Sequence, residues 1–355
     1  MLTRGQLATV ALALVASVAA GVLNAAGVEG VVAFVVAAAA LALLASVVGH
    51  ATEQLGARMG PGATGVLQSA LGNLPELFVG IFALRAGLVG VVQAALVGSV
   101  LGNSLLVLGI AFTVGGLRHG TQRFGAESAR MIAVLTVLAV SALAVPTLAQ
   151  LLHAPAAEHT EALSVASAVV LLLVFALSIP VSLQGGPQSV PDEAHEAEAG
   201  ELAWPLWLTG TLLTVAGVGA AFVSDWFVNA LQPAMNALGI SDAFAGLVVV
   251  ALAGNAVENV VGVQLAAANK PDYAVSVILN SSLQVALGLG PVLVLLSFVI
   301  GGAHLTLVLP PLLLVALGLT AGVSALIVYD GESTWLEGVI LVGLYALIAA
   351  SFWWG

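Results

Sequence analysis

The feature that most constrains this chain is a succession of apolar runs, each long enough to cross a bilayer and separated by short stretches rich in glycine, proline or charge. A helix needs about 20 apolar residues to cross the hydrocarbon core. The chain is 61% hydrophobic and only 7% charged, whereas a soluble domain carries about 25% charged residues. The pattern therefore predicts an all-α polytopic membrane protein.

Breaks at glycine, proline and charged clusters divide the chain into eleven expected membrane helices. They cover approximately residues 6–26, 30–50, 62–86, 89–116, 128–150, 161–183, 203–224, 243–268, 272–300, 304–328 and 334–354. The segment 225–241 contains Asp225 and Pro233 and is followed by Asp242, so we expect a loop with an amphipathic turn. Arg4 followed by the first apolar run resembles a secretory signal peptide. The run is long enough to cross the membrane, so we expect it to stay in the protein as the first membrane helix.

The basic residues fall mainly on one side of the membrane when eleven spans are counted from the N-terminus. Arg85 lies on one side, and the other six bases lie opposite: Arg4, Arg58, Arg118, Arg123, Arg130 and Lys270. Cytoplasmic loops carry an excess of Lys and Arg. The pattern predicts a cytoplasmic N-terminus and an external C-terminus, in the plasma (inner) membrane of a prokaryote.

Two short glutamate-containing stretches repeat each other in separate apolar runs. Residues 72–76 are Gly-Asn-Leu-Pro-Glu, and residues 254–258 are Gly-Asn-Ala-Val-Glu. An acidic side chain inside a membrane costs about 2.5–3.5 kcal/mol or more, so it usually has a function. We call the difference in residue number between the two glutamates the repeat offset. It relates four pairs, which are Gly72 and Gly254, Asn73 and Asn255, Glu76 and Glu258, and Ser99 and Ser281.

The third and eighth expected spans cross the membrane in opposite directions, so the repeats are predicted to be inverted, with a site between them at the midplane. We expect an extra N-terminal helix in 1–28, a five-helix repeat in 29–183, a cytoplasmic linker in 184–202 and a second five-helix repeat in 203–355. The linker contains five acids, which are Asp192, Glu193, Glu196, Glu198 and Glu201. A solvated connector and a regulatory segment that concentrates or senses divalent cations both fit this composition.

Two facing glutamates at the midplane are expected to bind either protons or a cation. Two buried like charges are costly unless a counter-charge compensates them. A divalent cation supplies two positive charges at once, so protons and the cation compete for the same carboxylate oxygens. This competition is the physical basis of an antiporter.

The available donor atoms favour a hard cation, because the chain has no cysteine. Ca²⁺ takes about 6–8 oxygen ligands. Glycine before each glutamate indicates a broken helical turn, and Pro75 frees the carbonyl of Leu71. Further oxygen donors are Asn73, Asn255, Ser99, Asn103, Ser281, Ser282 and Gln284. Close packing and interhelical hydrogen bonds are equally compatible roles for these small and polar residues.

These residues carry a family resemblance. The segment 72–109, with Gly-Ser-Val-Leu-Gly-Asn at 98–103, resembles the first α-repeat of the cation/proton exchangers in the Ca²⁺:cation antiporter superfamily. The segment 254–290, with Ser-Ser-Leu-Gln at 281–284, is similar to the second α-repeat. The resemblance implies export of Ca²⁺ against H⁺ by alternating access, with no prosthetic group. It implies that Glu76 and Glu258 carry the cation or the protons. It extends a lining role to Gly72, Asn73, Gly254, Asn255, Ser99, Asn103, Ser281, Ser282, Gln284 and the neighbouring Asn259.

Two positions depart from the family pattern. Asn259 stands where the family usually has a histidine, so that histidine's role cannot be transferred. Pro75 precedes the first glutamate, as in the sodium/calcium exchanger branch. That branch generally adds an acid in the stretch aligned with 280–285, where this chain has no acid and offers Ser and Gln instead. Protons are therefore favoured over sodium, and Na⁺/Ca²⁺ exchange and Mn²⁺/H⁺ exchange remain alternatives.

Other function classes fit the sequence less well. A channel would need a ring-forming filter, and an intramembrane protease would need a motif such as His-Glu-x-x-His; neither is visible. The basic footprint of a nucleic-acid-binding protein is also missing. The expected protein is therefore not an enzyme, and its partners are Ca²⁺, H⁺ and the lipid bilayer, with a homo-oligomer left open.

Overall fold

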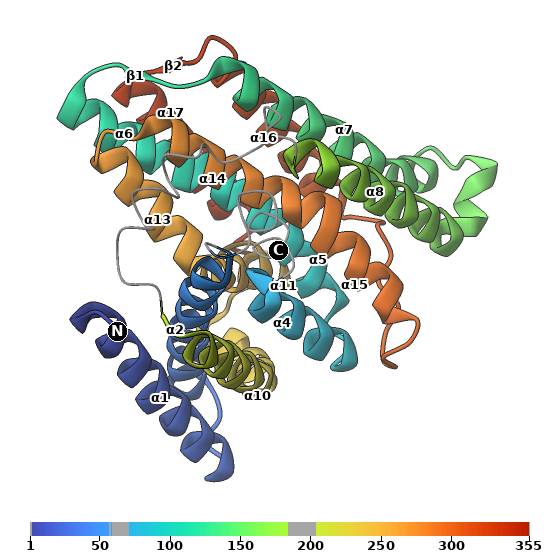
Figure 1. Cartoon of the computed structure of the whole chain (residues 1–355). Helices are drawn as coiled ribbons and strands as arrows, with labels where there is room; N and C mark the ends of the chain where they lie inside the picture. The colour runs from blue at the N-terminus through green and yellow to red at the C-terminus, as the bar shows by residue number, and fades with distance from the viewer. Residues whose placement is uncertain (1, 57, 59–70, 184–203, 355) are drawn as a thin grey trace.

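A computed structural model describes residues 2–56, 58, 71–183 and 204–354, which are almost wholly helical (Figure 1). The helices of the first half are α1 (Arg4–Ala25), α2 (Val31–Gly56), α4 (Leu74–Arg85), α5 (Val89–Leu101), η1 (Gly102–Val107), α6 (Leu108–His119), α7 (Ala126–Leu151), η2 (Pro155–His159) and α8 (Thr160–Leu183). Those of the second half are α10 (Leu206–Leu238), α11 (Asp242–Phe244), η3 (Ala245–Val250), α12 (Ala251–Gly254), α13 (Ala256–Ala267), α14 (Pro271–Gln284), η4 (Val285–Leu289), α15 (Gly290–Ser297), α16 (Pro311–Ile327) and α17 (Trp335–Ser351).

Within the described residues, seven helices are long and apolar enough to cross a membrane. An eighth span is present if Asp242–Gly254 and Glu258–Ala267, which meet at a bend of 65°, are counted together. Helices α16 and α17 are apolar but shorter, and the expected third span begins outside the described residues. The prediction of an all-helical polytopic membrane protein is confirmed, and the count of eleven spans stays a prediction.

The prediction of a loop at 225–241 is wrong, because α10 continues without interruption from Leu206 to Leu238. The buried face of this extension packs against α2, where Phe34 stacks on Phe227 with ring centroids 5.0 Å apart. Leu231 and Ala234 continue the same buried face. Proline inside a helix costs about 3 kcal/mol. Packing of this face against α2 offsets that cost at Pro233.

The most buried membrane-length helices form the centre of the molecule. One consists of α5, η1 and α6, and the other of α14, η4 and α15. Helices α1, α2 and α10 lie together on one side, and α7 and α8 lie together on another (Figure 1). The buried centre is therefore where polar side chains from the two halves of the chain can meet.

Three segments inside the long helices are π-helical, namely η1, η3 and η4. A π-helical turn contains an extra residue, so it shifts the faces that the flanking α-helices present, and it is frequent at functional sites. Segment η1 begins three residues after Ser99 and includes Asn103, and η4 begins directly after Gln284. The polar positions singled out in the sequence therefore lie at changes of helical register.

The only described strands are two residues long and join two connections at one end of the bundle. Strand β1 (Gln122–Arg123) pairs antiparallel with β2 (Glu332–Ser333). The side chains of Arg123 and Glu332 also form an ion pair at 3.1 Å. The connection after α6 therefore lies beside the connection after α16.

Candidate functional site

Both glutamates of the repeated motif occupy the third position of a twelve-residue helix that follows a break. Helix α4 begins at Leu74, after a turn at residues 72 and 73, and α13 begins at Ala256, directly after the break that ends α12. The first turn of a helix leaves amide N–H groups without intrahelical partners and favours negative charge. Each local sequence therefore places a carboxylate at the positive end of a helix.

The carboxylate of Glu76 is bound by side chains from both halves of the chain. Its Oε1 accepts a hydrogen bond from Ser99 Oγ at 3.2 Å and another from Asn255 Nδ2. The Asn255 amide also donates to Ser99 Oγ at 2.9 Å. Gly254 allows this approach, because a Cβ there would lie only 2.8 Å from Glu76 Oε1. The fold thus brings a glutamate of one motif against the Gly-Asn of the other.

A second layer of hydrogen bonds extends from Asn255 into the buried centre. Asn103 Nδ2 donates to Ser281 Oγ at 2.9 Å and approaches Asn255 Oδ1 at 3.4 Å. Ser281 Oγ also approaches Asn255 Oδ1 at 3.4 Å. All three side chains are almost fully buried. The network therefore connects η1, α14 and the break between α12 and α13.

Two further contacts join predicted site residues across the halves. Ser282 Oγ lies 3.0 Å from Ser104 Oγ, and both side chains are fully buried. Asn73 Nδ2 approaches Gln284 Oε1 at 3.5 Å. Ser104 was missed from the sequence, where its position beside Asn103 was the only signal. It matters because it continues the polar contact between η1 and α14.

The second glutamate is half-buried in the first turn of α13, three residues after Asn255. Next to Glu258, the Oδ1 atom of Asn259 is buried and has no hydrogen-bond partner among the described residues. Gly72 is half-buried in the turn before α4. The five acids of the predicted linker, Asp192, Glu193, Glu196, Glu198 and Glu201, lie outside the described residues.

A cavity adjoins Glu76 between α4, α5, α12 and α15. Among the described residues that line it, Glu76 and Ser99 are the polar ones, and the rest are apolar, as at Val79, Leu96 and Leu293. Apolar walls around a carboxylate provide no replacement for water. A cation or a proton bound at Glu76 would therefore be stabilised by the few polar side chains described above.

The donor set is made of carboxylate, amide and hydroxyl oxygens. The part of the chain that the structure describes holds no group of three or more His, Cys, Asp or Glu side chains placed to bind a metal. Two carboxylates supplemented by neutral oxygens suit a hard cation such as Ca²⁺. Because the donors come from both halves, any movement of one half against the other changes the surroundings of a bound ion.

Comparisons with known proteins agree over nearly the whole chain. Residues 29–184 and 208–354 match the family described as sodium/calcium exchanger protein. The chain is 38% identical over 339 residues to a Ca²⁺/H⁺ antiporter of Synechocystis sp., with 90% of each chain covered. It is 35% identical over 335 residues to a Ca²⁺/H⁺ antiporter of Aphanothece halophytica, covering 90% of this chain and 89% of the relative. The solved Ca²⁺/H⁺ antiporter YfkE superposes with a TM-score of 0.82 at 29% identity, covering 97% of this chain and 98% of that one.

Proposed function

Because this chain belongs to the sodium/calcium exchanger protein family, we propose that it is a secondary antiporter that exports Ca²⁺ from the cytoplasm in exchange for H⁺. The relatives that it matches over about nine-tenths of its length are Ca²⁺/H⁺ antiporters. The observation that carries the proposal is the Glu76 carboxylate, which is hydrogen-bonded by Ser99 of its own half and by Asn255, three residues before Glu258 in the second motif.

The exchange mechanism follows from charge balance at the two glutamates. In the Ca²⁺ form, the carboxylates neutralise the cation, and Ser99, Asn103 and Asn255 supply neutral oxygens. In the proton form, the carboxyl groups are neutral without a cation. Both forms can be carried through an alternating-access step at low electrostatic cost. The site with neither ion holds two uncompensated charges, which is expensive inside a membrane, so export of Ca²⁺ is coupled to return of protons.

The proposed architecture is eleven membrane helices, with an extra helix in 1–28 and two inverted five-helix repeats in 29–183 and 203–355. The repeat offset supports it, because the same difference in residue number separates the start of α4 from that of α13 and the start of α5 from that of α14. The first motif occupies 72–109 and the second 254–290, separated by the cytoplasmic linker at 184–202. Inverted repeats place equivalent half-helices on both sides of a midplane site.

Na⁺/Ca²⁺ exchange is the second candidate, and the observation in its favour is Pro75 before the first glutamate. The stretch 280–285 argues against it, because Ser281 and Gln284 bind Asn103 and Asn73 there without adding a negative charge. A site with two carboxylates balances one Ca²⁺ or two protons and leaves no third charge for an additional Na⁺. Mn²⁺ uses similar oxygen donors and is the alternative substrate.

The test is ion exchange in proteoliposomes with the purified full chain. We expect an imposed Ca²⁺ gradient to drive proton movement without Na⁺, and we expect Glu76→Gln and Glu258→Gln to abolish it. Glu158→Gln is the matched control, because Glu158 is exposed in η2. Normal exchange by either site variant would contradict the paired-carboxylate mechanism.

A wild-type protein that requires Na⁺ and ignores pH would support the sodium alternative. Replacing Ca²⁺ by Mn²⁺ in the same assay decides which cation is the substrate.

A further inference from the structure

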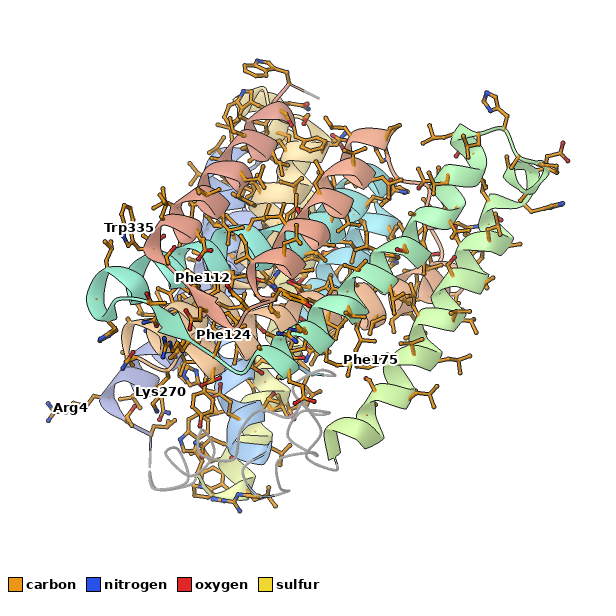
Figure 2. All side chains as sticks on the ribbon, turned by 90° about the horizontal axis from the view of Figure 1, so that it is seen from above. Arg4, Phe112, Phe124, Phe175, Lys270 and Trp335 are labelled. Atoms are coloured by element: carbon orange, nitrogen blue, oxygen red, sulfur yellow. The ribbon has the colours of Figure 1, made fainter. Side chains whose placement is uncertain are left out.

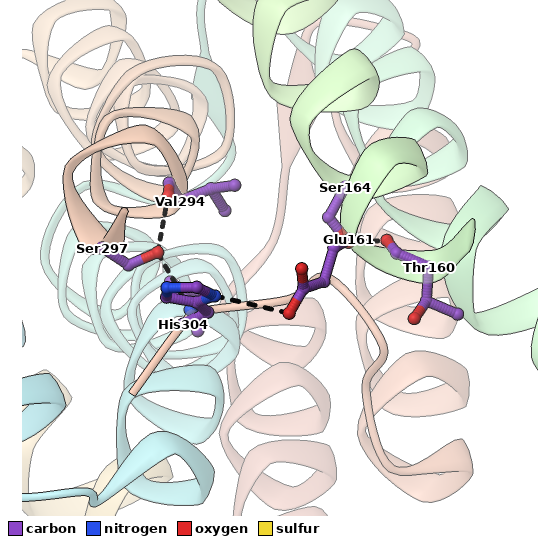
Figure 3. Close-up of polar contacts among 7 residues, drawn as sticks. Thr160, Glu161, Ser164, Val294, Ser297 and His304 are labelled. Atoms are coloured by element: carbon purple, nitrogen blue, oxygen red, sulfur yellow. Dashed lines mark hydrogen bonds and ion pairs between the residues drawn. The ribbon is translucent and has the colours of Figure 1, made fainter. Parts of the chain in front are cut away.

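The connection between α15 and α16 contains a non-helical segment with alternate buried leucines, residues 301–309, which we call the α15–α16 strap. Leu305, Leu307 and Leu309 are buried, and each donates its backbone N–H to a hydroxyl group at 2.9–3.0 Å. The acceptors belong to three different helices and are Ser297 of α15, Ser164 of α8 and Thr147 of α7. Figure 3 shows Ser297 on one side of His304 and Ser164 on the other, with His304 facing Glu161 of α8.

Gln93 of α5 binds the carbonyl groups of the same strap. Its Nε2 donates to Thr306 O at 2.8 Å and to Val308 O at 2.9 Å, and its side chain is buried. Backbone groups buried away from water need partners, and this segment obtains them from side chains rather than from a sheet. The strap is thereby fixed to α5, α7, α8 and α15 at once.

The strap also holds the C-terminal end of α4, the helix whose first turn carries Glu76. Ala303 N donates to Leu84 O at 3.1 Å. Gly302 has a φ of +99°, and a Cβ there would lie 2.7 Å from both Leu84 O and Arg85 Cα. Helix α4 has only twelve residues, or about 18 Å at 1.5 Å per residue. Because a short helix moves as a rigid unit, fixing its last turn restricts the glutamate in its first turn.

A corresponding contact exists at the end of α13, the helix that carries Glu258. His119, at the end of α6, lies with Nε2 3.0 Å from Ala267 O. Gly115 lies close to the same helix end, where a Cβ would be 3.3 Å from Ala266 O. The repeat offset that relates the glutamates also relates Leu84 to Ala266 and Gly302 to Gly120. The end of α6 at His119 thus contacts the last turn of α13, as the strap contacts the last turn of α4.

The segment 119–125, which consists of the last residue of α6 and the connection that follows it, is itself held in place. Phe124 stacks on Phe112 of α6 with centroids 5.8 Å apart, and Figure 2 shows the two rings side by side. Gly125 N donates to Asp272 Oδ1 at the start of α14, and Phe124 N donates to Gly331 O at 2.9 Å. Each half of the chain therefore contributes one secured connection that contacts the glutamate-bearing helix of the other half.

We propose that residues 301–309 and 119–125 are reciprocal anchors that position the two glutamates, and that Gln93 and Gly302 are positioning residues for Glu76. The link to ion affinity rests on the proposed antiporter function. The attachment of α4 to the second half of the chain does not depend on that function. In this arrangement α4 and the strap stay together during transport, so a looser strap weakens binding of the ion at Glu76.

The sharpest test compares Gly302→Ala with Gly301→Ala in the full chain. Both glycines have positive φ, +99° and +73°, so both variants carry backbone strain. Only at Gly302 does the added methyl group meet α4, since nothing lies within 4 Å at Gly301. We expect amide hydrogen exchange of residues 74–85 to rise about fivefold or more in Gly302→Ala alone, the size expected when about one hydrogen bond is lost. The half-saturating Ca²⁺ concentration should rise in parallel, with the maximal rate per folded transporter retained.

Equal behaviour of the two glycine variants, or loss of maximal rate with unchanged half-saturation, overturns the proposal. Gln93→Leu is the second variant, because it removes both bonds to the strap carbonyls without touching α4, and it should give the same two changes if Gly302→Ala does not fold. Amide hydrogen exchange of α4 can be measured on a protein that transports no ions. If the wild-type protein exchanges no ions, the proposed function fails, and the amide measurement still decides whether the anchor exists.

Discussion

At the scale of single residues, the Asn255 side chain connects more of the candidate site than any other described group. Its amide donates toward Glu76, toward Ser99 Oγ at 2.9 Å and toward Ala251 O at 2.9 Å. Its carbonyl oxygen faces Asn103 and Ser281, each at 3.4 Å. A buried network of this kind is sensitive to the loss of one member, because the remaining groups lose their partners without gaining water.

The first prediction therefore concerns Asn255→Ala. Removing the amide leaves Glu76 with Ser99 and leaves a gap beside Ser281, so we expect a cost of about 1–3 kcal/mol in ion binding. This corresponds to a half-saturating Ca²⁺ concentration raised about 5- to 150-fold, measured by Ca²⁺-driven proton flux in proteoliposomes. The control is Asn280→Ala, because Asn280 is on α14 next to Ser281 but bonds Ser276 at 3.3 Å. An unchanged half-saturation in Asn255→Ala would remove Asn255 from the site.

The contacts of this site were only partly predictable from the sequence. The glutamates could be singled out by the cost of a membrane charge, and the repeat offset paired Ser99 with Ser281. Ser104 could not be found in this way, because its counterpart at the same offset is Ala286. Its contact with Ser282 depends on the register of η1, which hydrophobic periodicity does not reveal. The transport roles of all these residues stay predictions.

At the scale of helices, the crossing of α5 and η3 is the closest contact near the site. A Cβ at Gly98 would overlap the backbone of Leu247, and a Cβ at Gly246 would overlap Val91 O. Small residues at helix interfaces let backbones approach in membranes. Ser99 follows Gly98 directly, so this crossing also fixes the helix that presents Ser99 to Glu76.

The second prediction compares two glycines one turn apart on this helix. Gly98→Ala should destabilise the folded protein by about 1–3 kcal/mol, as expected for overpacking a close contact. Gly102→Ala should be tolerated, because nothing lies within 4 Å of its added methyl group and alanine is about 0.5–1 kcal/mol better than glycine in a helix. Thermal unfolding in detergent gives the comparison. A fall in Tm of the same size for both variants would contradict the crossing.

Helix boundaries show where sequence patterns were informative and where they were not. Apolar runs predicted most of the long helices, because a membrane span needs a continuous apolar length. The end of α10 was misplaced because Asp225 and Pro233 resemble helix breakers, yet the same stretch buries Phe227 against α2. The π-helical segments were missed because hydrophobic periodicity does not distinguish a π-helical turn from the α-helix around it.

At the scale of the whole molecule, the connections gather at two ends of the bundle. One end joins β1 to β2, places His119 beside Ala267 and brings Arg130 onto Tyr329 O at 2.6 Å. The other end places Gly302 on α4 and joins Ser241 N to Trp353 O at 3.3 Å. The grouping supports the alternation of connections that eleven spans require. It does so from contacts, independently of the charge count that suggested the orientation.

The last prediction concerns which end faces the cytoplasm. Arg123 and Lys270 lie on the connections at the first end, and Arg118 and Arg130 lie in the adjoining turns of α6 and α7. An excess of basic residues marks the cytoplasmic side. The chain has no cysteine, so a single cysteine introduced at an exposed position is the only thiol of the protein that can react. In intact cells, a membrane-impermeant maleimide should label Glu29→Cys and His159→Cys but not Lys270→Cys, which should react only after the cells are opened. The reverse pattern would invert the proposed orientation and place the C-terminus in the cytoplasm, while the ion gradients would still set the direction of Ca²⁺ movement. Labelling that differs between Glu29→Cys and His159→Cys would contradict the span count, because an even number of spans separates these two connections in the eleven-helix arrangement.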